Sequence, residues 1–240
     1  MHDQKDDGVI KGIIFDKDGT LFDFNATWGT WARGMLEAET GGDPGLFATL
    51  ADALGYDIGA NRFQPGSIVI AATVGEVADA ILQVMPDQDR SALLTRMNAT
   101  AAEVEQVEAV PLIPYFTDLR AMGLSLGIAT NDAEAPALRH LVRAGVVDLF
   151  DFIAGYDSGH GAKPAPGQLY AYCKKTGLEP AQCVMVGDST HDLDAGRAAG
   201  MRTIGVLTGP ARQAELAPFA DVVFPTIAAI PDWLISQNQG

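Results

Sequence analysis

The sequence carries little positive charge. Its 240 residues include 31 aspartates and glutamates against only 16 lysines and arginines, which gives a formal net charge of −15 at pH 7. This balance argues against non-specific binding to nucleic acid or to anionic membrane surfaces. It also means that an anionic substrate needs a local source of positive charge within its binding site.

Cysteine is also scarce, and targeting signals are missing. Cys173 and Cys183 form no CxxC pair and lie in apolar-patterned segments, so we expect buried reduced thiols and no disulfide framework. Residues 1–8 lack the basic and apolar regions of a signal peptide. No uncharged apolar run reaches the roughly 18 residues of a transmembrane helix. These absences favour a cytoplasmic protein without a membrane partner.

The order of the predicted elements indicates an α/β fold with an insert. Strands alternate with helices from residue 111 onward, which predicts parallel strands joined by right-handed crossovers. Between residues 24 and 110, strand-like runs disappear and helical periodicity takes over. We therefore predict a Rossmann-like parallel sheet core at 1–23 and 111–240, with an inserted all-α domain at 24–110.

The same patterns set expected bounds for the elements. Apolar runs predict strands at 9–16, 124–130, 149–154, 183–186, 203–207 and 222–224. Within the insert, periodicity predicts helices at 27–38, 46–54, 68–84 and 90–107, with a loop at 55–66. Glycines end the predicted core helices at 115–122, 133–144, 167–176 and 190–199.

Polar side chains follow four of the predicted core strands. They are Asp16 and Asp18 after the first, Thr130 and Asn131 after the second, Lys163 in the loop after the third, and Asp188 and Asp192 after the fourth. If these strands are neighbours, their carboxyl ends meet at one edge, where open α/β sheets bind ligands. We expect the side chains to converge there.

These residue types suit phosphoryl transfer with a divalent metal. Several neighbouring carboxylates need a counter-charge, and oxygen ligands suit a hard cation, usually Mg²⁺. A lysine with short hydroxyl and amide groups supplies donors for a tetrahedral oxyanion. Asp16 can then carry the phosphoryl group as a nucleophile, and Asp18 can transfer protons.

The spacing of Asp16 and Asp18 has a geometric reason. Adjacent residues of a strand point to opposite faces, so carboxylates two positions apart face one site. Lys17, which stands between them, is therefore expected to point away. We expect its loss to cost far less activity than the loss of Asp18.

These segments resemble the four motifs of the haloacid dehalogenase superfamily, in particular its phosphatases with a helical cap, of the phosphoglycolate phosphatase type. The matching motifs are Asp-Lys-Asp-Gly-Thr at 16–20, Thr-Asn at 130–131, Lys-Pro at 163–164 and Gly-Asp-Ser-Thr-His-Asp at 187–192. The predicted insert lies between the first two motifs, which is where this family carries its cap.

The resemblance implies a Mg²⁺-dependent phosphatase with an aspartyl-phosphate intermediate. Asp16 would be the nucleophile and a Mg²⁺ ligand. Asp18 would be the general acid and base, and its backbone carbonyl would bind the metal. Asp188 would bind Mg²⁺ directly, and Asp192 would support the metal indirectly.

On the substrate side, the resemblance implies that Thr130, Asn131 and Lys163 bind phosphate. The expected substrate is a small phosphate ester, with 2-phosphoglycolate as the family-level expectation and sugar phosphates and nucleoside monophosphates still open. Arg62 is the only cation in the predicted loop 55–66. It has two interpretations, a contact to the substrate beyond phosphate or an ordinary surface arginine.

Two other functions stay open at this point. A sugar-phosphate mutase of the same superfamily differs mainly in its cap contacts and in the protection of the phospho-enzyme from water. A non-enzymatic phospho-accepting domain needs neither Asp18 nor so large an insert. A dehalogenase would not need Asp18, and a phosphonatase of this superfamily uses a cap lysine, which this insert lacks. The oligomeric state is also open.

Overall fold

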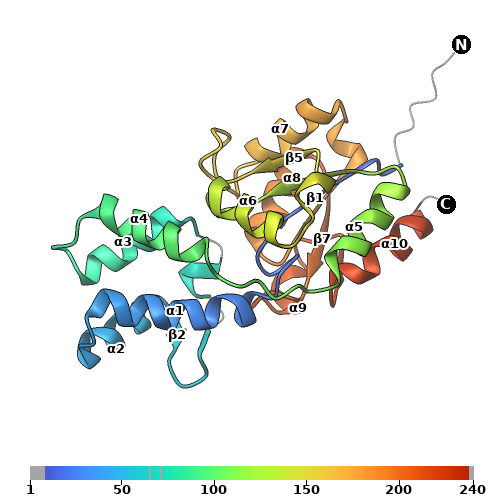
Figure 1. Ribbon diagram of the computed structural model, residues 1–240. Helices are drawn as coiled ribbons and strands as arrows, with labels where there is room; N and C mark the ends of the chain where they lie inside the picture. The colour runs from blue at the N-terminus through green and yellow to red at the C-terminus, as the bar shows by residue number, and fades with distance from the viewer. Residues whose placement is uncertain (1–8, 65, 71, 238–240) are drawn as a thin grey trace, which may run out of the picture.

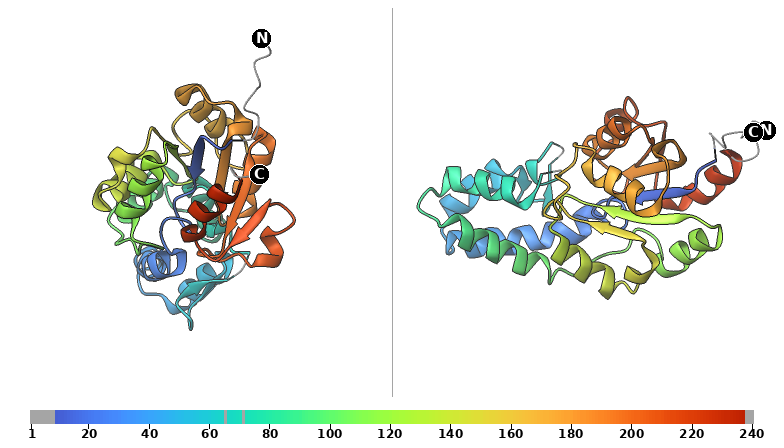
Figure 2. Two further views of the ribbon diagram at one scale, coloured as in Figure 1. Left: turned by 90° about the vertical axis from the view of Figure 1, so that its right-hand side faces the viewer. Right: turned by 90° about the horizontal axis from the view of Figure 1, so that it is seen from above.

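The chain folds into two lobes (Figure 1; Figure 2). The computed structural model describes residues 9–64, 66–70 and 72–237. One lobe holds a sheet with helices on both faces. The other lobe is formed by the segment between the first two strands of that sheet, coloured blue to green in Figure 1.

The core sheet has six parallel strands in the order β5-β4-β1-β6-β7-β8. Their bounds are β1 Gly12–Phe15, β4 Ser125–Ala129, β5 Phe152–Ala154, β6 Cys183–Gly187, β7 Arg202–Val206 and β8 Val222–Phe224. The chain builds outward from β1 on both sides, so the strand order reverses there. Open α/β sheets bind ligands at such a point. The predicted parallel α/β core is confirmed.

Helices cover both faces of this sheet. Their bounds are α5 Leu112–Ala121, α6 Glu134–Arg143, α7 Gly167–Thr176, α8 Thr190–Ala199, α9 Gln213–Leu216 and α10 Ile230–Gln237. Short 3-10 turns lie at η2 Val147–Leu149, η3 Pro180–Gln182 and η4 Ile227–Ala229. The first four helices lie close to their predicted bounds, whereas α9 and α10 are additional.

Strand β1 is buried on both faces, as its apolar run predicts. Ile13 and Phe15 belong to the cluster that contains buried side chains of α5 and α10. Ile14 faces the other way and packs in the cluster of α7 and α8. Because alternate side chains of a strand point to opposite faces, this one strand contacts both helical layers and holds its carboxyl end in place.

The insert is not all-helical, which corrects the prediction. Its helices are α1 Phe24–Thr40, α2 Pro44–Ala53, α3 Val74–Val84 and α4 Arg90–Ala101. The predicted loop contains a short antiparallel hairpin of β2 Tyr56–Asp57 and β3 Arg62–Phe63. The Asp57 carboxylate accepts a hydrogen bond from the Ala60 amide at 2.9 Å. Asparagine tolerates the positive φ of 52° at Asn61.

The predicted helix at 68–84 is also divided. A 3-10 turn, η1 Ile68–Ile70, comes first, and α3 then begins after Thr73. Thr73 and Glu76 form a capping box in which each side chain bonds the backbone amide of the other residue. This satisfies amides that the first helical turn leaves unpaired, so the helix begins there.

The insert has a hydrophobic core of its own. Leu36 and Ile81 are among its buried residues, and this cluster is separate from those around the sheet. Two separate cores support our proposed division into a core domain, residues 1–23 and 111–240, and a cap domain, residues 24–110. Among the described residues, no helix is long and apolar enough to cross a membrane.

Candidate active site

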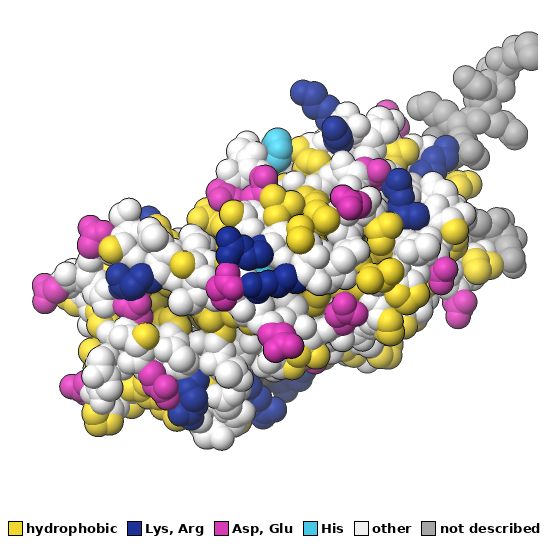
Figure 3. Space-filling view, viewed as in Figure 1, with side chains coloured by type: hydrophobic (Ala, Val, Ile, Leu, Met, Phe, Trp, Pro, Cys, Tyr) yellow, Lys and Arg dark blue, Asp and Glu magenta, His cyan; other side chains and the backbone are white. Residues whose placement is uncertain are grey.

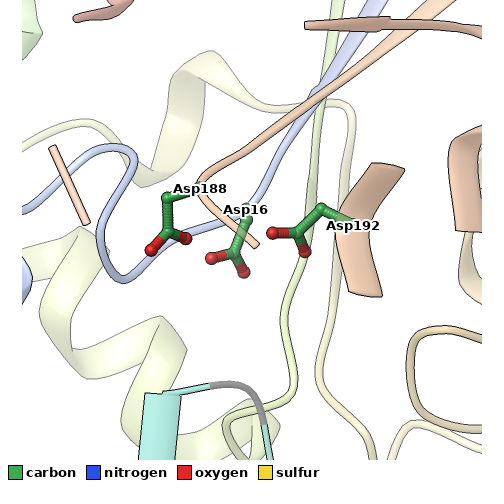
Figure 4. A group of neighbouring side chains, drawn as sticks. All are labelled: Asp16, Asp188 and Asp192. Atoms are coloured by element: carbon green, nitrogen blue, oxygen red, sulfur yellow. The ribbon is translucent and has the colours of Figure 1, made fainter. Parts of the chain in front are cut away.

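Three carboxylates meet at the carboxyl edge of the two central strands. Asp16 follows β1, Asp188 follows β6, and Asp192 stands in the first turn of α8. All three are buried, and one oxygen of each lies within 4.8 Å of the others. Figure 4 shows Asp16 in the middle of the three. The structure thus brings together three carboxylates that the sequence analysis singled out.

Lys163 supplies positive charge between two of these carboxylates. Its ammonium group donates to Asp16 Oδ1 at 2.7 Å and to Asp192 Oδ1 at 2.6 Å. Burial alone would lower the pKa of Lys163, but the charges of Asp16 and Asp192 outweigh burial and raise this pKa. The lysine therefore stays charged and is a local cation in an acidic protein.

The remaining carboxylate oxygens fit a hard divalent cation. Asp188 Oδ2 is buried and has no hydrogen-bond partner among the described residues, which is costly for a charged group unless a cation binds there. Burial raises the pKa of Asp188, and it raises the pKa of Asp16 to about 7 against the opposing charge of Lys163. An oxygen-only ligand set is typical of Mg²⁺. Asp16 and Asp188 are therefore the carboxylates that would hold the metal.

Asp192 differs because protein groups bond both of its oxygens. Oδ1 accepts from Lys163, and Oδ2 accepts from the Ser189 amide at 3.0 Å and from its hydroxyl at 2.7 Å. One carboxylate thereby caps the first turn of α8 and fixes the lysine. This geometry fits indirect support of a metal better than direct ligation.

Two glycines leave room for the Asp188 carboxylate. A Cβ atom at Gly19 or at Gly209 would overlap that carboxylate. The Thr208 hydroxyl donates to the Gly19 carbonyl at 2.6 Å and joins the loop after β7 to the loop after β1. Thr208 and Gly209 could not be predicted from the sequence, because neither a single bond between two loops nor the space that a glycine leaves has a local pattern.

Thr130 and Asn131 follow β4 and line the cleft beside the carboxylates. Thr130 Oγ1 accepts from the Asp132 amide at 3.1 Å, which leaves its hydroxyl proton available to a phosphate oxygen. The Asn131 side chain bonds the Lys163 backbone twice, donating to its carbonyl at 2.9 Å and accepting from its amide at 2.8 Å. Asn131 therefore positions the loop that contains Lys163. The peptide bond between Lys163 and Pro164 is cis.

Lys17 lies outside the lining of the cleft that Asp16 and Asp18 share, but its side chain contacts Asp18, which strand alternation does not predict. Its fully buried ammonium group donates to Asp18 Oδ2 at 2.6 Å and lies 3.4 Å from Asp132 Oδ2. Burial alone would lower the pKa of Lys17, but the charges of these two carboxylates raise it. Strand alternation does not predict this contact, because β1 ends at Phe15 and beyond it a long side chain can fold back.

Two further side chains complete the surroundings of Asp18. Trp28 of α1 donates from Nε1 to Asp18 Oδ1 at 2.9 Å, so a cap helix contacts this carboxylate directly. His140 of α6 is buried, and burial together with the charge of Lys17 lowers its pKa to about 4. The neutral ring then accepts from Lys17 at Nδ1 (3.1 Å) and donates from Nε2 to the Ala101 carbonyl at 2.9 Å.

A cleft of about 100 Å³ lies between the core and the cap. The core side carries Asp16, Asp18, Thr130, Asn131, Asp132, Lys163, Ser189, His191 and Asp192. The cap side comes from α1, α3, α4 and the segment around η1. Arg62 is exposed on β3 and does not belong to this lining, so the structure does not bring it to the cleft.

Comparison with known sequences agrees with this geometry. The family model of haloacid dehalogenase-like hydrolases matches residues 10–200. The chain belongs to this family. A phosphoglycolate phosphatase from Nitrosospira multiformis is 31% identical over 205 residues, which cover 83% of this chain and 84% of that protein. Another, from Neisseria meningitidis, is 27% identical and covers 94% of this chain and 89% of that protein.

Solved structures share the fold of this haloacid dehalogenase-like hydrolase. A family member from Bacteroides fragilis superposes with a TM-score of 0.72 at 21% identity, covering 92% of this chain and 99% of that one. A β-phosphoglucomutase from Clostridium difficile superposes with a TM-score of 0.66 at 18% identity, covering 96% and 98%. At these identities the likeness shows the fold alone.

Proposed function

We propose that this hydrolase is a Mg²⁺-dependent phosphatase that cleaves a small phosphomonoester through an aspartyl-phosphate intermediate. The observation that carries the proposal is the cluster of Asp16, Asp188 and Lys163, in which two carboxylates fit a divalent cation beside a buried ammonium group. The chain is a phosphoric monoester hydrolase, as the names of its relatives indicate. We also propose that the protein is cytoplasmic, as expected from its sequence.

In this reaction Asp16 attacks phosphorus, forming a bond from its carboxylate oxygen while the ester oxygen leaves. Lys163 lies 2.7 Å from that carboxylate, so its ammonium group would hold both the nucleophile and a phosphate oxygen. The Thr130 hydroxyl and the Asn131 side chain would bind further phosphate oxygens.

Asp18 would handle the protons. It would donate one to the leaving alcohol oxygen and then accept one from the water that hydrolyses the aspartyl phosphate. Lys17 and Trp28 each bond one of its oxygens, so the carboxylate is oriented before the substrate arrives. Such orientation lowers the barrier because no rearrangement is needed during the reaction.

The metal would be held by the carboxylates of Asp16 and Asp188 and by the backbone carbonyl of Asp18, with Asp192 in indirect support. Mg²⁺ bound there would neutralise negative charge on the transferred phosphoryl group. The buried unpaired oxygen of Asp188 is the feature of this chain that favours such an ion.

Alternative functions fit less well. A sugar-phosphate mutase shares the fold, and the names of the sequence relatives favour a phosphatase over it. A phospho-accepting binding domain would not need the two hydrogen bonds that orient Asp18. The relatives make 2-phosphoglycolate the first metabolite to assay, but the cap decides what lies beyond the phosphate.

Hydrolysis of p-nitrophenyl phosphate tests the proposed function. We expect turnover with Mg²⁺, its loss in a chelator, and a fall in kcat of at least about a thousandfold in Asp16→Asn. Asp118→Asn, an exposed position on α5, is the matched control and should keep its activity. Turnover that is unchanged in the chelator or in Asp16→Asn would contradict the proposal.

A further inference from the structure

The cleft has a charged floor and an apolar roof. The floor is the carboxylate and lysine cluster of the core. The roof is formed by the cap, and among the described residues it includes Trp28, Trp31, Val69, Ile70, Val74 and Met97. When phosphate lies on the floor, the alcohol half of the ester must point toward this roof. The roof therefore determines which alcohols the site accepts.

The described part of the roof contains no cation. Arg90 and Arg96 pair with carboxylates of the cap at 2.6 and 2.7 Å. Arg33 donates to the Ile58 carbonyl at 3.0 Å, and Arg62 is exposed on β3. The lining of the cleft includes none of these four arginines. A carboxylate on the alcohol half of the substrate would find no partner of opposite charge there.

The cation on the floor is already engaged. Lys163 is the only lysine or arginine among the described residues of the lining, and it bonds two carboxylates. A second anionic group on the substrate would join an acidic cluster and would lose its hydration against apolar side chains, which is costly without a paired charge.

One polar side chain interrupts the roof. Asn98 of α4 lines the cleft, and its buried Oδ1 has no hydrogen-bond partner among the described residues. A neutral amide can bond one hydroxyl group of a substrate, but it supplies no charge for a carboxylate. Asn98 Oδ1 can therefore accept a hydrogen bond from one hydroxyl group on the alcohol half of the substrate.

Resting on the proposed phosphatase function, we infer that the preferred substrate is a phosphomonoester of a small, uncharged and mainly apolar alcohol, with room for a single hydroxyl. The apolar side chains of the roof favour an alkyl or arylmethyl group. By the same reasoning 2-phosphoglycolate, whose alcohol half ends in a carboxylate, is a poor substrate of this chain.

The test compares kcat/KM for propyl phosphate, benzyl phosphate and 2-phosphoglycolate with Mg²⁺. All three release an alkoxide-type oxygen, so differences report on the roof rather than on leaving-group chemistry. We expect the two neutral esters to exceed 2-phosphoglycolate by at least about tenfold. Equal or better turnover of 2-phosphoglycolate overturns this inference and leaves the proposed function standing. No Mg²⁺-dependent turnover of any ester, p-nitrophenyl phosphate included, overturns both.

A pair of variants in η1 tests the same inference from the protein side. Ile70 lines the cleft, whereas Ile68 of the same turn is exposed and does not. Ile70→Arg supplies the missing cation, so we expect the ratio of kcat/KM for 2-phosphoglycolate to that for propyl phosphate to rise by about tenfold. Ile68→Arg should leave this ratio unchanged. Equal shifts in both variants would contradict the assignment of the roof.

Discussion

Two buried lysines hold the carboxylates of the proposed active site from different sides. Lys163 bonds Asp16 and Asp192, and Lys17 bonds Asp18. Buried charges persist in proteins when they are paired and hydrogen-bonded. Each lysine therefore stabilises the acidic site before a metal or substrate binds, and a neutral replacement leaves a carboxylate without its counter-charge.

Replacing Lys17 by methionine tests the contact with Asp18. The substitution keeps most of the buried volume and removes one of the two donors that orient this carboxylate. We expect kcat to fall at least about tenfold and the free energy of unfolding to fall by about 3 kcal/mol. Steady-state kinetics and urea unfolding measure the two effects. Lys174→Met, at an exposed position of α7, should change neither, and an unchanged kcat in Lys17→Met would count against the role of Lys17.

Replacing Gly209 by alanine tests the space around Asp188. The new Cβ would overlap that carboxylate, so the proposed metal ligand must move. We expect the Mg²⁺ concentration for half-maximal activity to rise by about 10- to 100-fold. Gly34→Ala is the control, because nothing lies within 4 Å of a Cβ built there. Equal Mg²⁺ requirements in the two variants would show that Asp188 does not bind the metal.

At the scale of elements, periodicity and helix-ending glycines predict α7 and α8 well. Each helix ends at a glycine in the left-handed conformation, Gly177 or Gly200. The hairpin of the cap and the break before α3 could not be predicted in this way. They depend on single turn and capping bonds of Asp57 and Thr73, which leave no periodic signal.

Only part of the candidate site could be predicted from the sequence. Asp16, Asp188 and Asp192 could be selected from the sequence, because parallel strand order brings strand ends together. The contacts of Lys17 and Trp28 could not, since each depends on where a long side chain lies relative to a segment distant in the sequence or beyond a strand end. Sequence patterns report the backbone better than they report such contacts.

Helix α1 joins the cap to Asp18, the proposed general acid and base. Trp28→Phe keeps the aromatic packing but removes the N–H that bonds Asp18. We expect kcat to fall by about tenfold with little change in the free energy of unfolding. Trp233→Phe, on α10 and outside the lining of the cleft, serves as the matched control for kcat. An equal kcat loss in the two variants would mean that the bond from Trp28 to Asp18 does not matter for catalysis.

At the scale of the whole molecule, the net charge of −15 has different consequences at the surface and inside. On the face in Figure 3, acidic and basic side chains are interspersed, and no large basic patch gathers. Inside, burial raises the pKa of Asp16 to about 7 and that of Asp132 to about 6. In the metal-free protein, burial therefore makes the ionised forms of these two carboxyl groups unfavourable.

These raised pKa values give the metal-free protein an unusual pH dependence. At Asp16 the folded state binds more protons than the unfolded state between the ordinary aspartate pKa of 3.8 and about 7, so the stability that this group contributes is lost as pH rises through that range. Buried His140, with its pKa lowered to about 4, has the opposite effect, because its contribution to stability increases as pH rises. In a chelator we expect the free energy of unfolding to be higher near about pH 5.5 than near about pH 8, by roughly 1 kcal/mol.

Urea unfolding with and without Mg²⁺ measures this effect. Because a bound cation neutralises the same carboxylates, Mg²⁺ should stabilise the protein more at the higher pH than at the lower pH. Metal-free stability that increases with pH over this range would contradict the assignment of the acidic cluster as the source.

The central claim is that Asp16 carries the phosphoryl group, and trapping the phospho-enzyme tests it most directly. Asp18→Asn should slow hydrolysis of the intermediate, so acid quenching after mixing with substrate and Mg²⁺ should preserve it for peptide mass spectrometry. We expect one phosphoryl group on Asp16 that is missing when Mg²⁺ is chelated. A phosphoryl group on another residue, or substrate consumption by the wild-type and the variant without any phosphorylated Asp16, would contradict it.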